Sequence, residues 1–235
     1  MSVWVAIKDF ILQSLNYLYS VVGDYGLAII LLTIVMRIIL MPLTIKQTKS
    51  MYEMQRIQPK IKELQKKHKD DKQKLQEETL KFYQENKVNP FGGCLPLILQ
   101  MPVFIALFQV LAGKKPPSLP LYLAAHPEVS KNFLFILPDI TKSPQWMFSK
   151  EGLLAALPYV VLALLFALSV WLPQQLMPGD KQQKMIGLYM AIMMLWFGWI
   201  SPAGVLLYWV TSSAWQVAQQ QILIKSYSRE KAQGE

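Results

Sequence analysis

The chain has 235 residues, of which 53% are hydrophobic and 17% charged, and its formal net charge is +9. The charged residues are concentrated in one block while several long segments contain almost none, which excludes an ordinary soluble domain and predicts a polytopic membrane protein. The lone cysteine, Cys94, excludes an intrachain disulfide, and with His68 and His126 as the only histidines a zinc or iron–sulfur site is disfavoured. We expect no cofactor, and we assign the basic charge to topology and anionic lipid rather than to specific nucleic acid binding.

Residues 1–24 are predicted to form an N-terminal amphipathic interfacial helix. At about 100° per residue, a narrow polar arc interrupts an otherwise apolar surface, as is typical of a helix at the interface or packed against other helices. A cleaved signal peptide is the alternative, but the segment has no basic start and no small-residue cleavage site before Gly23. The polar arc consists of Ser2, Asp9, Gln13, Asn16 and Ser20.

The first membrane span is predicted over residues 25–45, because about 20 mostly apolar residues are needed to cross the hydrocarbon core. Arg37 lies inside this span, where an arginine costs roughly 2.5 kcal/mol or more and normally faces water, a partner or a functional cavity. Its side chain could instead snorkel to the interface near Lys46. Thr33 and Thr44 share the helical face of Arg37, which favours a polar cavity.

Residues 46–94 are predicted to form a cytoplasmic charged helical hairpin. Twelve Lys or Arg and seven Asp or Glu fall between residues 46 and 89, so the segment is too polar for lipid. Apolar residues recur at helical spacing in two sets, which predicts two antiparallel amphipathic helices with Pro59 starting or kinking the first. The lysines form either a solvated face or a docking surface for lipid, ribosome or targeting factors. Those assigned to recruitment are Lys60, Lys62, Lys66, Lys67, Lys72 and Lys74.

Four further spans are predicted, which makes five in all. The hairpin, a short loop and the C-terminal tail are basic and therefore belong on the cytoplasmic side, so the chain is expected to run from an outside N-terminus to a cytoplasmic C-terminus. The remaining segments are 95–112 (second span), 113–152 (extracytoplasmic loop), 153–172 (third span), 173–184 (short cytoplasmic loop), 185–200 (fourth span), 205–224 (fifth span) and 225–235 (cytoplasmic tail).

Polar residues in three of the spans are expected to lie at one depth. Gln100 in the second span lies at a depth comparable to that of Arg37. In the fifth span a polar stripe runs down one face at helical spacing, formed by Tyr208, Ser212, Gln216 and Gln219. Helices that each offer a polar group at one depth can line a hydrated pocket, which lowers the cost of the buried arginine.

Three long motifs resemble the YidC family of membrane protein insertases, which includes the mitochondrial Oxa and chloroplast Albino relatives. They are the arginine of the first span with the hairpin sequence QPKIKELQKKHKDD, then NPFGGCLPLILQMPVFIALFQVL, and finally GVLLYWVTSSAWQVAQQ. The resemblance covers nearly the whole chain and implies an all-α integral membrane protein with five transmembrane helices around a hydrophilic groove, open to the cytoplasm and to lipid. The groove residues that it implies are Arg37, Gln100, Thr211, Ser212, Ser213 and Gln216, to which the helical faces add Thr33 and Tyr208.

The chain also departs from the family pattern. Ser212 and Ser213 stand where many relatives carry asparagine, so polarity is kept but amide hydrogen bonding is lost. About 24 residues precede the first span, Cys94 is the one cysteine, and the tail has 11 residues. The chain therefore resembles a minimal bacterial member, without the large extracytoplasmic domain, the lipid-modified cysteine or the long basic tail of other members.

The resemblance implies a protein of the bacterial cell membrane that inserts and helps to fold membrane proteins without nucleotide hydrolysis, and we expect no enzymatic activity. Consistently, the sequence has no phosphate-binding glycine loop, no HExxH motif and no nucleophile–base set. The expected partners are nascent membrane proteins and the lipid bilayer, with the Sec translocon, the ribosome and the signal recognition pathway as further candidates. Two alternatives stay open: a folding chaperone that acts only with the Sec translocon, and a small anion transporter using Arg37, although no inverted repeat is recognisable.

Overall fold

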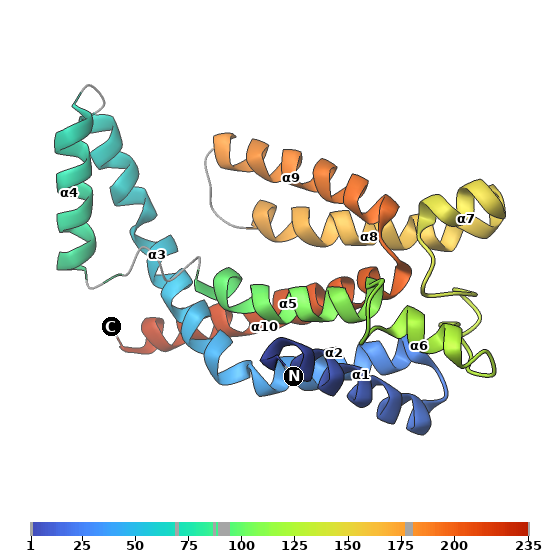
Figure 1. The fold of residues 1–235 in the computed structure, drawn as a ribbon. Coiled ribbons are helices and arrows are strands. Elements are labelled where there is room, and N and C mark those ends of the chain that lie inside the picture. The colour runs from blue at the N-terminus through green and yellow to red at the C-terminus, as the bar shows by residue number, and fades with distance from the viewer. Residues whose placement is uncertain (1, 69–70, 87, 89–94, 177–180, 235) are drawn as a thin grey trace. The chain divides into compact units, whose positions relative to one another are not determined.

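The computed structural model describes residues 2–68, 71–86, 88, 95–176 and 181–234, and this part of the chain is folded mainly into α-helices (Figure 1). For these residues the predicted all-α fold is confirmed, and the β-type contact found among them is an isolated bridge between Phe133 and Leu137. The helices are α1 (Val3–Val22), α2 (Tyr25–Ile39), α3 (Met41–Lys67), α4 (Lys72–Glu85), α5 (Leu95–Ala112), α6 (Leu119–Ala125), α7 (Pro144–Lys150), α8 (Leu153–Leu176), α9 (Lys181–Ile200) and α10 (Ala203–Gly234).

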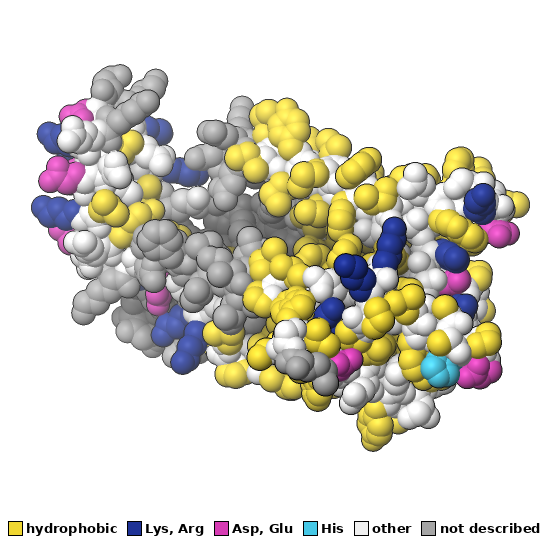
Figure 2. Space-filling view, in the orientation of Figure 1, with side chains coloured by type: hydrophobic (Ala, Val, Ile, Leu, Met, Phe, Trp, Pro, Cys, Tyr) yellow, Lys and Arg dark blue, Asp and Glu magenta, His cyan; other side chains and the backbone are white. Residues whose placement is uncertain are grey.

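The chain divides into two compact units. The bundle unit comprises Met1–Ile39 and Pro102–Val217, and the hairpin unit comprises Leu40–Met101 and Ala218–Glu235. Their surfaces differ in the way that the sequence predicts: hydrophobic side chains dominate the visible face over α8 and α9, whereas charged side chains gather over α3 and α4 (Figure 2). The apolar surface is suited to lipid and the charged surface to water.

One apolar core holds the bundle unit together, and α1, α2, α5, α6, α7, α8 and α10 all contribute to it. Leu15, Tyr25, Leu107, Phe166 and Leu206 are among its fully buried side chains. α8 packs beside α9 (Figure 1), and the outward side of α8 is apolar too, as expected of a helix surrounded by lipid. The exposed apolar side chains of α8 are Leu153, Leu154, Leu157, Val161, Leu164, Leu165, Leu168 and Leu172.

A glycine and an aspartate make the sharp turn between α1 and α2, which are bent by 119°. Gly23 ends α1 with φ at 71°, a left-handed conformation that glycine adopts without steric cost. Asp24 then caps α2, because its Oδ1 accepts a hydrogen bond from the Leu27 N–H at 2.9 Å. Beyond the turn, the Tyr25 hydroxyl donates to Asn16 Oδ1 at 2.8 Å and ties the two helices together.

α1 is the helix predicted for the N-terminal segment, and it has three faces. One face packs on the bundle, where Trp4 donates its indole N–H to Gln109 Oε1 of α5 at 3.0 Å. The second is the polar arc of the sequence. The third is apolar and exposed, which suits a membrane interface, although the interfacial location stays a prediction. The apolar face consists of Val3, Ile7, Phe10, Tyr17 and Val21.

The apolar stretch 25–45 is shared by two helices. α2 ends at Ile39, and α3 begins at Met41 with Pro42 in its first turn. Proline has no N–H to continue the ladder of α2, but in the first turn of a new helix that N–H is not needed. Pro42 therefore explains the break between the two helices, which the uniformly apolar character of residues 25–45 does not predict.

Few of the described helices are long and apolar enough to cross a membrane by themselves. By length and composition, Leu153–Leu172 within α8 is the one that qualifies alone, and α1 with α2 qualifies as a bent pair. Gln100–Ala112 and Met185–Ile200 are shorter apolar helices. The five spans and their boundaries stay a prediction.

In the hairpin unit, α3 and α4 pack against each other as the sequence predicts (Figure 1). Asp71 caps α4, since its carboxylate accepts a hydrogen bond from the Lys74 N–H at 3.0 Å. Pro59 lies inside α3 and does not start it, so of the two predicted roles the kink is the one that stays a prediction. The small apolar core between the two helices consists of Ile57, Ile61 and Val88, flanked by Met54, Phe82 and Tyr83.

α10 is one continuous helix, so the predicted fifth span and the predicted tail are not separated by a break. Its C-terminal part packs on α3 within the hairpin unit. Gln219 donates from Nε2 to the Thr44 hydroxyl at 2.6 Å, and the rings of Tyr52 and Tyr227 lie 5.9 Å apart. The Thr44 hydroxyl is therefore engaged by α10.

Candidate functional site

The buried guanidinium of Arg37 is the centre of the candidate site. Arg37 lies near the end of α2 with 7% of its surface exposed. Its Nε and Nη2 donate to the Ser212 hydroxyl at 3.0 and 2.5 Å, and Nη2 also donates to Gln216 Oε1 at 3.2 Å. All three residues belong to the bundle unit, so α2 and α10 together hold the charge within one compact body.

The α10 side chains on the face that meets Arg37 differ in burial. Tyr208, Ser212 and Gln216 are four residues apart on α10 and share one face of the helix. Tyr208 is 4% exposed and Ser212 6%, whereas Gln216 is exposed. The burial of these side chains therefore decreases along α10 from Tyr208 to Gln216.

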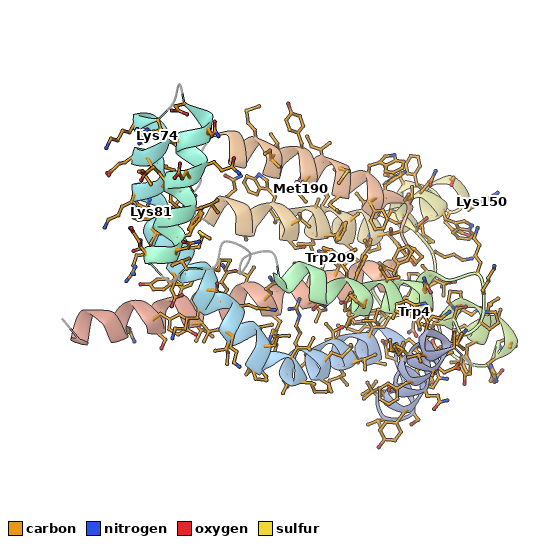
Figure 3. The ribbon with its side chains drawn as sticks, turned by 60° about the vertical axis from the view of Figure 1, so that its left-hand side comes forward. Trp4, Lys74, Lys81, Lys150, Met190 and Trp209 are labelled. Carbon is orange, nitrogen blue, oxygen red and sulfur yellow. The ribbon has the colours of Figure 1, made fainter. Side chains whose placement is uncertain are left out.

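Aromatic side chains pack around Tyr208 and Trp209 of α10. The ring of Phe104 on α5 lies 6.5 Å from that of Tyr208 and 4.9 Å from that of Trp209, which it meets edge-on. Trp209 in turn meets Phe166 of α8 edge-on at 5.4 Å (Figure 3). Edge-to-face pairs of this kind are a favourable aromatic packing, and they join three helices behind the arginine.

The hydrogen-bond partners of Arg37 carry no charge. A hydroxyl and a carboxamide accept from Nε and Nη2, and among the described residues Nη1 has no acceptor. A buried charge is normally paired with an opposite one or coordinated by a ligand. The Arg37 guanidinium can therefore still donate hydrogen bonds to a carboxylate, a carbonyl or a water molecule from outside the chain.

Several other predicted groove residues do not bond to Arg37. Thr33 is 2% exposed, and its hydroxyl donates to the Ile29 carbonyl of its own helix at 2.6 Å. Thr211 and Ser213 are half-buried on α10, on either side of Ser212. Gln100 is half-buried and belongs to the hairpin unit, so its common depth with Arg37 stays a prediction.

The lysines assigned to recruitment lie on α3 and α4 of the hairpin unit. Lys74 and Lys81 mark the exposed side of α4 (Figure 3). Lys62 is half-buried, and the side chain of Lys72 lies outside the described residues. Their role in recruitment stays a prediction. The exposed members of the predicted set are Lys60, Lys66, Lys67 and Lys74.

Sequence reasoning missed Trp215, the residue before Gln216. Its indole Nε1 is buried and finds no acceptor among the described residues, although the side chain as a whole is only half-buried. A buried N–H without an acceptor costs free energy and usually has a reason. The sequence feature that could have indicated Trp215 is its position among the polar residues of α10, since tryptophan has an apolar ring and one N–H donor.

Comparison with known proteins identifies the family. The family model described as 60Kd inner membrane protein matches residues 17–231. The chain belongs to this family. The membrane protein insertase YidC of Caldanaerobacter subterraneus subsp. tengcongensis is 37% identical over 213 residues, which cover 91% of this chain and 91% of the relative. The YidC insertases of Pseudoalteromonas atlantica and Francisella tularensis subsp. novicida are 36% and 34% identical over 95% and 94% of this chain, but over only 37% and 36% of their own length.

A solved structure of a 60Kd inner membrane protein relative agrees with the fold. The crystal structure of an active YidC insertase with its first transmembrane domain resolved superposes with a TM-score of 0.68 at 28% identity. The match covers 93% of this chain and 46% of the other. The resemblance to the YidC family is therefore confirmed, and the chain is a helical membrane protein. Among the described residues, no group of three or more His, Cys, Asp or Glu side chains could hold a metal ion.

Proposed function

We propose that this protein is a membrane protein insertase, which receives the polar or acidic flank of a nascent membrane protein at Arg37 and passes the hydrophobic segment into the bilayer without hydrolysing nucleotide. The observation that carries the proposal is a buried arginine whose hydrogen-bond partners, Ser212 and Gln216, are neutral. The names of its relatives support the same activity.

Electrostatics explains how Arg37 would act. A charge attracts an opposite one far more strongly in a low-dielectric site than in bulk water. The polar or acidic flank of an incoming segment would therefore be drawn towards the guanidinium from the Gln216 side, and the site would shorten the apolar distance that the flank must cross. The membrane potential adds about 2.3 kcal/mol per charge per 100 mV. Together with burial of the apolar segment in lipid, this supplies the driving force.

The architecture proposed for this activity is a hydrophilic groove lined by the first, second and fifth spans. Five spans run from an outside N-terminus to a cytoplasmic C-terminus, and the substrate moves into lipid beside α8 and α10. The exposed apolar side of α8 supports this exit. The side chains that complete the groove are Thr33, Gln100, Tyr208, Thr211 and Ser213.

The decisive experiment is insertion of a single-span substrate with an acidic N-terminal flank into vesicles that contain the purified protein. Arg37→Ala should slow insertion about tenfold to a hundredfold, if a lost charge-assisted hydrogen bond is worth about 1.5–3 kcal/mol, and Arg37→Lys should retain most of it. Arg56→Ala, which removes the same charge from an exposed position on α3, serves as the control. Undiminished insertion by Arg37→Ala would contradict the proposed role of the charge.

The same vesicles separate the alternatives. Because they contain no Sec translocon, a chaperone that only assists Sec would be inactive in them. A transporter would instead carry small anions through the pure protein.

The hairpin unit is proposed to recruit substrate, ribosome or targeting factors. Deleting residues 50–85 should then abolish insertion while the rest of the protein still accumulates in the membrane. Insertion at the normal rate would make the hairpin a solvated connection only.

A further inference from the structure

A tight turn in the loop between α6 and α7 presents three apolar side chains to the outside of the bundle unit. Phe133 and Leu137 pair at its base. Phe135 at its tip is 95% exposed, and its neighbours Leu134 and Ile136 are 41% and 45% exposed. Consecutive large apolar residues at such exposure are unusual on a surface that meets water.

The turn is held rigidly by hydrogen bonds. The Leu134 N–H donates to Asp24 Oδ2 at 2.5 Å, and Asn132 Nδ2 donates to the Leu134 carbonyl at 2.7 Å. The Phe133 N–H donates to the Leu137 carbonyl at 2.8 Å. Leu134 has φ at 49°, a conformation that L-residues avoid unless their surroundings enforce it. The exposed tip is thus a fixed feature of the fold.

The turn lies beside the start of α2. Asp24 caps that helix, and the Phe133 ring lies so close to Gly26 in its first turn that a Cβ there would be 2.2 Å from Phe133 Cδ2. The loop is also fastened to α1, because the Ser130 N–H donates to the Tyr19 hydroxyl at 3.3 Å. The loop that carries the tip is therefore fastened to the bundle unit at the end of α1 and at the start of α2.

We propose that the tip formed by Leu134, Phe135 and Ile136, here called the apolar tip, is a lipid anchor that inserts into the outer leaflet at the boundary between headgroups and acyl chains. Lipid is the occupant because the chain is a membrane protein, because the tip is joined to the start of α2, which the proposed topology places at the outer surface, and because its three consecutive side chains are apolar and exposed. Phenylalanine and leucine are among the side chains that interfacial segments bury at the boundary between headgroups and acyl chains, and Lys131 nearby suits anionic headgroups. The inference rests on the topology of the proposed function and adds a second contact with the membrane outside the spans.

Site-directed spin labelling tests the apolar tip directly. In a Cys94→Ser background, Phe135→Cys would carry the label in the full chain, reconstituted into vesicles of phosphatidylethanolamine and phosphatidylglycerol. Glu128→Cys, an exposed polar position of the same loop, is the aqueous control, and Leu164→Cys on the outward side of α8 is the lipid control. The measurement is the ratio of collisions with oxygen, which partitions into lipid, to collisions with a water-soluble nickel chelate.

The expected result is a ratio at position 135 several-fold above that at position 128 and close to that at position 164. If position 135 matches position 128 while position 164 reports lipid, the anchor is refuted and the membrane protein of the proposed function stands. If position 164 also reports water, both fail. Because Phe135 is almost fully exposed, its replacement removes no core packing, so a folding defect does not obscure the answer.

Discussion

Ser212 should be the residue that holds Arg37 in place, and a double-mutant cycle can measure how strongly. The Ser212 hydroxyl accepts from two guanidinium nitrogens, at 3.0 and 2.5 Å, and is 6% exposed. A hydrogen bond to a charged group contributes about 1.5–3 kcal/mol in proteins generally, whereas interhelical bonds in a membrane protein average about 0.6 and reach about 1.7 kcal/mol. Two short bonds to one buried charge place this pair at the upper end, at about 1.5 kcal/mol.

The cycle consists of Arg37→Met, Ser212→Ala and the double variant, with the free energy of unfolding measured by SDS titration in mixed micelles. Ser213→Ala is the matched control, because it removes the same hydroxyl from the next position of α10, where no hydrogen bond to Arg37 exists. Its coupling to Arg37→Met should be within about 0.3 kcal/mol of zero, the usual additivity of unconnected sites. The reasoning is refuted if Ser212 couples no more strongly than Ser213.

Three further changes test the packing. Asp24→Ala should lower the free energy of unfolding by about 2–4 kcal/mol, since the carboxylate both caps α2 and accepts from Leu134; Asp24→Asn keeps an acceptor and should lose clearly less. Gly26→Ala should cost about 1–3 kcal/mol through its clash with Phe133, and a cost that persists in a Phe133→Gly background, which removes the Phe133 Cβ as well as the ring, would contradict this cause. Ile61→Ala should destabilise the hairpin by about 2–5 kcal/mol, seen as faster hydrogen exchange in α4, whereas equal acceleration in α8 would argue against separate units.

The Arg37 site could be anticipated from the sequence because helical periodicity is a local property. The spacing of Tyr208, Ser212 and Gln216 places them on one face whatever the helix packs against. An arginine in an apolar stretch needs a polar neighbour. Helical periodicity alone does not determine whether Ser212 or Ser213 contacts Arg37. That depends on the rotation of α10 about its axis, which is set by packing in the core.

Contacts between distant segments were beyond the sequence. The bond from Leu134 to Asp24 joins residues 110 positions apart, and that from Trp4 to Gln109 joins residues 105 apart. Each requires a loop or helix to be placed by the rest of the core before the two groups can meet. The break between α2 and α3 within residues 25–45 could have been predicted, because proline breaks helices and Pro42 is visible in the sequence. The high hydropathy of the whole stretch favoured a single span instead.

The bend between α1 and α2 has a mechanical consequence. α1 is fastened near its start by the bond from Trp4 to Gln109 and near its end by the bond from Tyr25 to Asn16, so it cannot pivot freely about the 119° turn. If α1 lies at the membrane interface as predicted, sinking of the bundle unit would carry its polar arc towards the acyl chains, and rising would lift its apolar face into water. Both displacements raise the free energy, so α1 resists them. With α1 in that position, Arg37, twelve residues or about 18 Å along the helix from Tyr25, would be kept at a constant depth in the membrane.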